Sequence, residues 1–160
     1  QLAAEWYEYQ GYFIRRNVLV GRRARGGFES ELDVVAFHPG SRHLVHVEAS
    51  MDSDSWDRRE SRYAQKFSAG RRYIPELFTG FDLPEEIEQI AVLVYASKQN
   101  RQTLAGGRIV LANELLNEII TKLREKSINS SMVAECYPIL RTIQFMCQYR
   151  KDVIQALEEG

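Results

Sequence analysis

The residues LDVVAF at Leu32–Phe37 and LVHVEA at Leu44–Ala49 decide the fold, and a Pro-Gly turn at 39–40 stands between them. Branched apolar residues on both sides of such a turn are typical of a β-hairpin. Alternate residues of a strand share one face, so pairing of the two strands would bring Asp33 and Glu48 together. Two carboxylates at short range repel unless one is protonated or a cation lies between them. We therefore expect a site for Mg²⁺ or Mn²⁺, which prefer hard oxygen ligands.

The alternative is that Asp33 and Glu48 are unrelated surface carboxylates, since an isolated acid in a half-buried strand usually faces solvent. Two acids on neighbouring strands, each beside apolar residues, are less easily explained in this way. The preceding Gly26 and Gly27 let the chain turn tightly before the first acid, which favours a hairpin with a defined register.

The motifs ELDVVA at Glu31–Ala36 and VEAS at Val47–Ser50 resemble the core of the PD-(D/E)xK nuclease superfamily, in particular the branch of Holliday junction resolvases. The resemblance extends over roughly residues 2–96. It implies an α/β, restriction-endonuclease-like fold, in which a mixed sheet with flanking helices follows the order helix, three strands, helix, strand. It also implies a metal site formed by the side chains of Asp33 and Glu48 and by the carbonyl group of Ala49.

The chain departs from the family pattern at one catalytic position, because Ser50 stands where a lysine normally assists the attacking water. The family places a relocated lysine on the helix after the third strand in some members, which makes Lys66 the expected replacement. Arg62 would serve only as a charge, because arginine does not deprotonate at ordinary pH. The first helix of the family often supplies a further acid, and the resemblance therefore implies Glu5 as an additional metal ligand. The alternatives are a solvated basic helix face and an ordinary surface carboxylate.

Five arginines occur within eleven positions, although the net charge of the chain is only −1. Arginine suits phosphate because its planar guanidinium donates two parallel hydrogen bonds. The alternative is a solvated strand edge whose charge discourages aggregation. Beside a metal site we favour contact with the nucleic-acid backbone. The expected phosphate contacts are Arg15, Arg16, Arg22, Arg23, Arg25 and Arg62.

The remaining patterns predict the other elements. We expect a helix that ends near Gly11, a strand bent around residues 15–17, a helix over 55–70, a buried strand at 90–95 and a short strand at 108–111. An irregular connection is expected over 74–88, a helix over 114–126, and one or two helices over 132–158. Residues 1–111 are expected to form the nuclease-like core. Residues 112–160 would form a helical extension that packs on the core or makes a homodimer contact.

The composition is that of an ordinary globular protein, with 44% hydrophobic and 27% charged residues. No segment has the roughly 20 apolar residues needed to span a bilayer, and a cytoplasmic location is the default expectation. Cys136 and Cys147 are isolated and are expected to be buried thiols. His46 shares a strand face with Glu48, so it could orient a water molecule or contact phosphate, although packing in the core is favoured. The other two histidines are expected to be exposed beside the turn.

The sequence therefore predicts a metal-dependent nuclease that uses Mg²⁺ or Mn²⁺ and acts on a nucleic acid, with DNA expected. The alternative is a nuclease-fold module that binds nucleic acid or protein without catalysis. Ser50 favours this alternative, because a neutral hydroxyl supplies neither the charge nor the base strength of a lysine.

Overall fold

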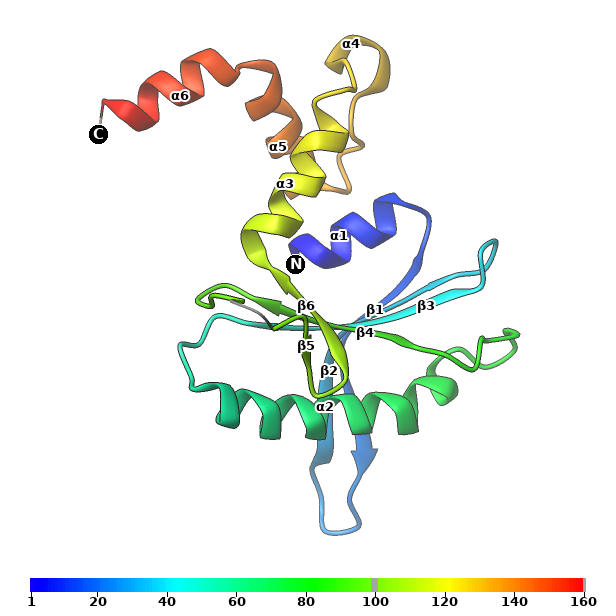
Figure 1. Ribbon diagram of the computed structural model, residues 1–160. Helices are drawn as coiled ribbons and strands as arrows, with labels where there is room; N and C mark the ends of the chain where they lie inside the picture. The colour runs from blue at the N-terminus through cyan, green and yellow to red at the C-terminus, as the bar shows by residue number, and fades with distance from the viewer. Residues whose placement is uncertain (99–100, 160) are drawn as a thin grey trace.

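A computed structural model describes residues 1–98 and 101–159, which form an α/β structure with one six-stranded mixed sheet and six helices (Figure 1). The helices are α1 (Leu2–Tyr9), α2 (Trp56–Leu77), α3 (Ala112–Leu123), α4 (Ile128–Ser131), α5 (Pro138–Gln148) and α6 (Arg150–Glu158). The strands are β1 (Phe13–Arg22), β2 (Phe28–His38), β3 (His43–Ser50), β4 (Glu88–Leu93), β5 (Thr103–Leu104) and β6 (Gly107–Leu111). The predicted α/β class is confirmed.

The strands lie in the order β1-β2-β3-β4-β6-β5. The first three strands are antiparallel, β3 pairs in parallel with β4, and β4 pairs in parallel with β6. The predicted hairpin is β2–β3, in which Val34 lies opposite Val47 and Val35 lies opposite His46. A parallel pair needs a long crossover connection, and α2 provides it between β3 and β4.

The two faces of the sheet are covered by different helices, with α2 on one face and α1 and α3 on the other (Figure 1). On the α2 face, Val35 and Phe37 pack with Ile74 of the helix. On the other face, Val34 and Val47 pack with residues of α1. The C-terminal helices pack around α1 through a separate apolar cluster, which consists of Trp6, Ile119, Leu123, Val133, Leu140 and Ile143.

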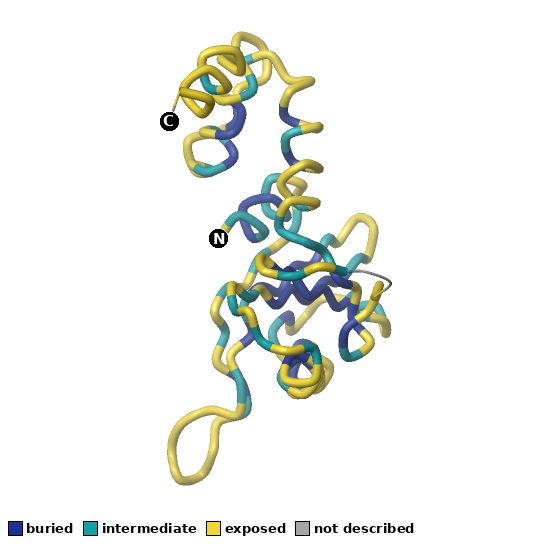
Figure 2. The backbone as a smooth tube through the Cα atoms, turned by 60° about the vertical axis from the view of Figure 1, so that its left-hand side comes forward, coloured by how far each residue is buried: buried dark blue, intermediate teal, exposed yellow. Residues whose placement is uncertain are grey.

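The ends of β1 and β2 form an arm that projects beyond α2, and its tip is exposed (Figures 1 and 2). Every residue over 22–29 is exposed. Within the segment 15–17, where a bend is expected, Asn17 has a φ of 51° in the left-handed region. The strand nevertheless continues as one element through Arg22, which makes it longer than the sequence predicts.

Helix α2 runs to Leu77, so the prediction that it ends at Gly70 and gives way to an irregular connection is wrong. Gly70 is a close-approach position rather than a stop signal, because a Cβ atom there would lie 2.3 Å from Nδ1 of His46. Buried Ile74 and Phe78 extend the packed face beyond it. Their burial stabilises the last turns although Pro75 lies within the helix.

The other differences are small. The sequence did not predict β5 or α4, and residues 94–95 lie beyond the end of β4. Cys136 is exposed and Cys147 is partly buried, so the expectation of two buried thiols is wrong. Pro138 occupies the first turn of α5, where its missing N–H costs no hydrogen bond. None of the described helices has both the length and the apolar character that crossing a bilayer requires.

Candidate active site

Asp33 and Glu48 lie side by side on the α2 face of the β2–β3 hairpin. The backbone N–H of Asp33 donates to Oε1 of Glu48 at 3.2 Å, and the N–H of Ala49 donates to Oδ2 of Asp33 at 2.9 Å. Each carboxylate therefore reaches across to the neighbouring strand. The alternating pattern of the two strands predicted this convergence, and the structure brings the two side chains together.

Lys66 of α2 places its ammonium group between these two carboxylates. Its Nζ donates to Oδ1 of Asp33 at 3.0 Å and also to Oε2 of Glu48. Buried Tyr63 and Phe67 anchor this part of the helix on the sheet, which fixes where the lysine reaches. Burial by itself would lower the pKa of Lys66, but the hydrogen bonds and negative charges of Glu48 and Asp33 outweigh it and raise the pKa above its ordinary value. The lysine is therefore held as a cation.

His46 holds Glu48 from the interior of the protein. Its Nε2 lies 2.7 Å from Oε1 of Glu48, and its Nδ1 lies 3.3 Å from the amide nitrogen of Gln89. The same amide nitrogen donates to the carbonyl of Phe67 at 2.8 Å, while Arg71 donates to the amide oxygen. Because an amide NH₂ group can only donate, Nδ1 of His46 accepts and the ring proton lies on Nε2. His46 therefore donates to Glu48 and fixes the orientation of that carboxylate.

The site is closed on the Glu48 side and open on the side of Asp33 and Lys66. The side chain of Glu48 is 1% exposed, whereas those of Asp33 and Lys66 are 28% and 27% exposed. Each of the four carboxylate oxygens accepts at least one hydrogen bond. An incoming ion or water would meet Asp33 and Lys66 first, with Glu48 behind them.

The donor set fits a hard divalent cation, because two carboxylates already converge on one positive charge. Within residues 1–98 and 101–159, no group of three or more His, Cys, Asp or Glu residues is arranged to hold a metal ion. A metal bound between Asp33 and Glu48 would therefore take its remaining ligands from water, from a backbone carbonyl such as that of Ala49, or from a phosphate. Mg²⁺ commonly keeps several waters in sites of this kind.

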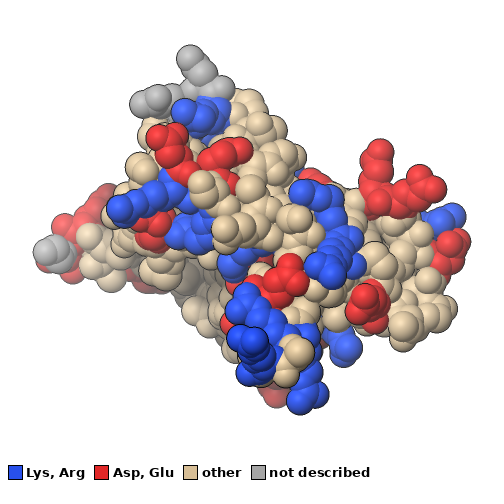
Figure 3. Space-filling model, turned by 90° about the horizontal axis from the view of Figure 1, so that it is seen from below, with Lys and Arg blue, Asp and Glu red and all other residues tan. Residues whose placement is uncertain are grey.

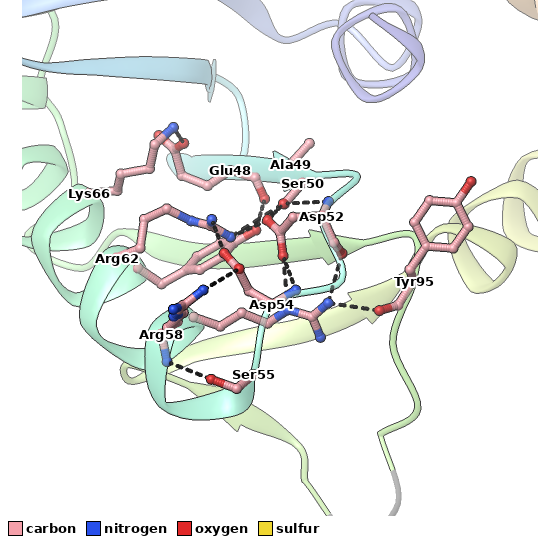
Figure 4. Close-up of polar contacts among 12 residues, drawn as sticks. Glu48, Ala49, Ser50, Asp52, Asp54, Ser55, Arg58, Arg62, Lys66 and Tyr95 are labelled. Carbon is pink, nitrogen blue, oxygen red and sulfur yellow. Dashed lines mark hydrogen bonds and ion pairs between the residues drawn. The ribbon is translucent and has the colours of Figure 1, made fainter.

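Ser50 belongs to a neighbouring ion-pair cluster rather than to the carboxylate pair (Figure 4). Its hydroxyl donates to Asp52 and accepts from Nη2 of Arg62 at 3.3 Å. Arg62 also donates to Oδ2 of Asp54 at 2.9 Å. The structure therefore places Ser50 in this cluster and not between Asp33 and Glu48. The serine helps to hold the start of α2, and the positive charge comes from Lys66.

Asp52 is the centre of this cluster. Buried Arg59 donates to Oδ1 of Asp52 at 3.2 Å, to its carbonyl at 2.8 Å and to the carbonyl of Tyr95 at 2.7 Å. Burial would raise the pKa of Asp52, but hydrogen bonds from the N–H of Asp54 and from Arg59 and Arg62 outweigh it and lower the pKa below its ordinary value. The cluster ties the first turn of α2 to the ends of β3 and β4, and so positions the helix that carries Lys66.

The structure does not bring Glu5 to the site, which corrects the expectation of an additional metal ligand. Glu5 lies on α1, and α1 and α2 cover opposite faces of the sheet (Figure 1). Its Oε2 accepts from the N–H groups of Ile139 and Leu140 at 2.9 and 3.2 Å. These are free N–H groups of the first turn of α5, so Glu5 acts as a helix cap supplied by a distant segment.

The arginines divide between two surfaces. Arg22, Arg23 and Arg25 are exposed on the projecting arm, where Lys and Arg side chains gather when the molecule is seen from the α2 side (Figure 3). Arg16 is separate from them, because it pairs with Glu8 of α1 at 2.5 Å on the other face of the sheet. Arg15 is exposed beside it and points to the opposite face, as strand neighbours do.

A groove of about 740 Å³ lies between the basic arm and Lys66 of the candidate site. It runs between the arm and α2, and its lining includes Arg23, Ser30, Arg62 and Lys66. Arg62 is 36% exposed and keeps one side toward this groove while it pairs with Asp52 and Asp54. The groove thus joins two of the predicted phosphate contacts to the lysine of the site.

The sequence did not identify the support of the site by Gln89, Arg71 and Arg59. The sequence places His46 on the same strand face as Glu48. It offered His46 as a core residue or as a group that orients water or contacts phosphate, and the structure buries His46 against Glu48. No family model, curated protein or solved structure matches this chain. Its function is therefore inferred from the arrangement of its own residues.

Proposed function

We propose that this protein is a metal-dependent nuclease with a restriction-endonuclease-like fold, and that it hydrolyses phosphodiester bonds in nucleic acid, with DNA as the expected substrate. The supporting observation is that Asp33 and Glu48 converge on one cation on the α2 face of the sheet, where Asp33 and Lys66 are open to solvent. The observed order of helix, three strands, helix and strand over residues 2–93 is compatible with that fold.

In this proposal Asp33, Glu48 and the Ala49 carbonyl hold Mg²⁺ or Mn²⁺. A divalent ion at this position would lower the pKa of a bound water and offset the negative charge that develops on the phosphate. His46 keeps Glu48 in place by donating to Oε1, which leaves Oε2 directed toward the cation. Orientation of a ligand by a buried hydrogen-bond partner is common in metal sites.

Lys66 supplies the positive charge that Ser50 lacks. Its ammonium contacts both carboxylates, so it would lie next to the reacting groups if the carboxylate oxygens held a metal ion. From there it would donate a hydrogen bond to the attacking water or to a phosphate oxygen. With the carboxylates free of metal, their hydrogen bonds and charges raise the pKa of Lys66 and hold it as a cation, which suits a role as a donor and a charge.

The arm provides the binding surface for the nucleic-acid backbone. Arg22, Arg23 and Arg25 are exposed there, and the groove leads from Arg23 to Lys66. Contacts to phosphate position a strand without reading its sequence, which suits arginines on a projecting hairpin. Binding through them should weaken as the salt concentration rises.

The experiment that tests this proposal is cleavage of end-labelled linear and four-way-junction DNA in Mg²⁺, in Mn²⁺ and in EDTA. The parent protein is expected to cut only with metal, and Asp33→Ala is expected to abolish cleavage while leaving the circular dichroism spectrum unchanged. Glu31→Ala is the matched control, because Glu31 is an exposed acid on the same strand. Equal cleavage by Asp33→Ala and the parent would overturn the assignment.

A second candidate is a catalytically inactive module that binds nucleic acid or protein. The observation in its favour is that Lys66 neutralises the carboxylate pair without a metal, and that every carboxylate oxygen has a donor. Such a module would bind DNA through the arm, would show no cleavage in any metal, and would bind no Mn²⁺ at millimolar concentration.

A further inference from the structure

The C-terminal helix α6 has an apolar side without a partner among the described residues. No residue of α6 is buried, and Ile154 and Leu157 are 52% and 75% exposed. In Figure 2 the stretch of chain that ends at the C-terminus is mostly yellow, in contrast to the partly dark blue helices beside it. A nine-residue helix is short for independent stability, because most helical stability in proteins comes from packing of an apolar side. This helix therefore has the properties of a segment that is completed by a contact with another molecule.

An apolar groove of about 550 Å³ lies directly beside this helix. It is formed by three helices, with Leu116 and Ile120 from α3, Met146 from α5 and Ile154 from α6 among its lining residues. Met146 is 45% exposed. The groove and the apolar side of α6 are contiguous. The α6 helix of one molecule could therefore bind in the groove of another, while its own groove binds the α6 helix of that molecule.

The charges at the two ends of α6 mostly oppose its own dipole. The first turn, where the helix dipole favours acids, carries Arg150 and Lys151 beside one acid, Asp152, and the C-terminal end, where it favours bases, carries Glu158 and Glu159. In an antiparallel pair of such helices, each basic end meets the acidic end of the other. Arg150 and Glu158 are equally far from Ile154 along the chain, so a two-fold axis at Ile154 would bring Arg150 of each copy opposite Glu158 of the other.

We propose that two copies of this chain associate through α6, which packs antiparallel to its symmetry mate. Leu157 of each copy then enters the groove between α3 and α5 of the other. The partner is a second copy rather than an unrelated protein, because α6 is self-complementary. It carries an apolar side, and its basic end matches the acidic end of a second α6. This proposal is independent of the proposed nuclease activity.

The experiment is sedimentation velocity of the full chain over a concentration series up to about 100 µM. The parent is expected to be a dimer, and Leu157→Glu is expected to weaken dimerisation at least about tenfold because it places a charge in the apolar contact. Gln155→Glu is the matched control, since it adds the same charge to the same helix away from the apolar stripe. Circular dichroism checks that both variants keep their helices.

A charge exchange tests the antiparallel arrangement. Arg150→Glu and Glu158→Arg are each expected to weaken the dimer, and the double variant R150E/E158R is expected to restore it, because the two charges then meet with their signs exchanged. A parent that is monomeric at the highest concentration would overturn the proposal. A dimer that is indifferent to Leu157→Glu, or a double variant no better than the single ones, would overturn it as well.

Discussion

Glu48 and Glu5 are both 1% exposed, but they lie on opposite faces of the sheet and have different partners. Glu5 accepts from two backbone N–H groups at the start of α5 and from Gln1. Glu48 accepts from two ionisable side chains, His46 and Lys66, and lies next to a second carboxylate. Burial is equal in the two cases, so burial alone does not distinguish a structural acid from a candidate catalytic one.

The difference lies in what surrounds each acid. Backbone N–H groups are fixed by the helix they belong to, so Glu5 can do little except complete the capping of α5. The pair that Lys66 bridges consists of side chains and opens to solvent through Asp33. A buried carboxylate beside a second carboxylate and a side-chain cation is therefore a candidate for binding a divalent ion.

The largest predicted effect is the loss of cleavage in Glu48→Gln compared with Glu5→Gln. Glu48→Gln removes a ligand charge and should lower the cleavage rate about 1,000-fold, which corresponds to about 4 kcal/mol in the barrier. Glu5→Gln should leave the rate of the folded protein unchanged. The measurement is the single-turnover rate of both variants on the same labelled DNA.

Urea unfolding of Glu48→Gln and Glu5→Gln measures how much each acid contributes to the free energy of unfolding. Glu5→Gln should cost about 1–3 kcal/mol of stability, because it weakens a charged cap on α5. If Glu5→Gln instead lost cleavage at full stability, the distinction between the two acids would be wrong.

A smaller effect on cleavage is expected from Lys66→Met. This variant separates the role of the Lys66 ammonium from that of the Asp33 and Glu48 carboxylates. Without the ammonium group, the cleavage rate should fall about 100-fold, since a positioned hydrogen-bond donor of this kind contributes about 3 kcal/mol. Mn²⁺ should bind more tightly than to the parent, because the ammonium no longer competes for the oxygens of Asp33 and Glu48. Calorimetry and cleavage assays on one preparation measure both quantities.

Lys66→Arg is the control for Lys66→Met, because it keeps the charge and changes the shape of the donor. It should retain part of the activity. Weaker metal binding in Lys66→Met would contradict the competition between ammonium and metal.

The smallest effect concerns Asp52, which holds the start of α2, and it is a dependence of the free energy of unfolding on pH in the acid range. Its pKa in the folded protein lies below the ordinary value of 3.8, so its pairing stabilises the protein fully above pH 3.8, and this contribution is lost as the pH falls through the folded value. Asp52→Asn should therefore cost about 1.5–3 kcal/mol at pH 7 and progressively less below pH 3.8. Urea unfolding of both proteins at pH 7 and in steps below pH 4 provides the measurement. A constant difference across that range would show that Asp52 is not held as an anion by Arg59 and Arg62.

The strand pattern predicted most of what positions the site. Alternation in two apolar runs was enough to pair Asp33 with Glu48, because a strand has a fixed period of two residues. The mixed sheet followed from the order of helical and extended segments. Local sequence could also indicate the start of α2, where Ser55 accepts from the N–H of Arg58.

The features that the sequence did not predict depend on tertiary contacts. Gly70 resembled a helix end, but its missing side chain makes room for His46, a contact that no local pattern contains. Glu5 lay beside an apolar helical stripe, and only the docking of α5 shows that it is a cap. The resemblance offered Lys66 as one replacement for the missing lysine, but its position between Asp33 and Glu48 depends on how α2 lies across the sheet.

Calorimetric titration with Mn²⁺ of the parent and of Asp33→Asn tests the central claim most directly, namely that Asp33 and Glu48 form a site for a divalent ion. The parent should bind Mn²⁺ with a dissociation constant below about 1 mM, and Asp33→Asn should bind at least about tenfold more weakly at unchanged stability. Absence of binding to the parent at about 10 mM Mn²⁺, or equal binding by both proteins, would contradict the claim.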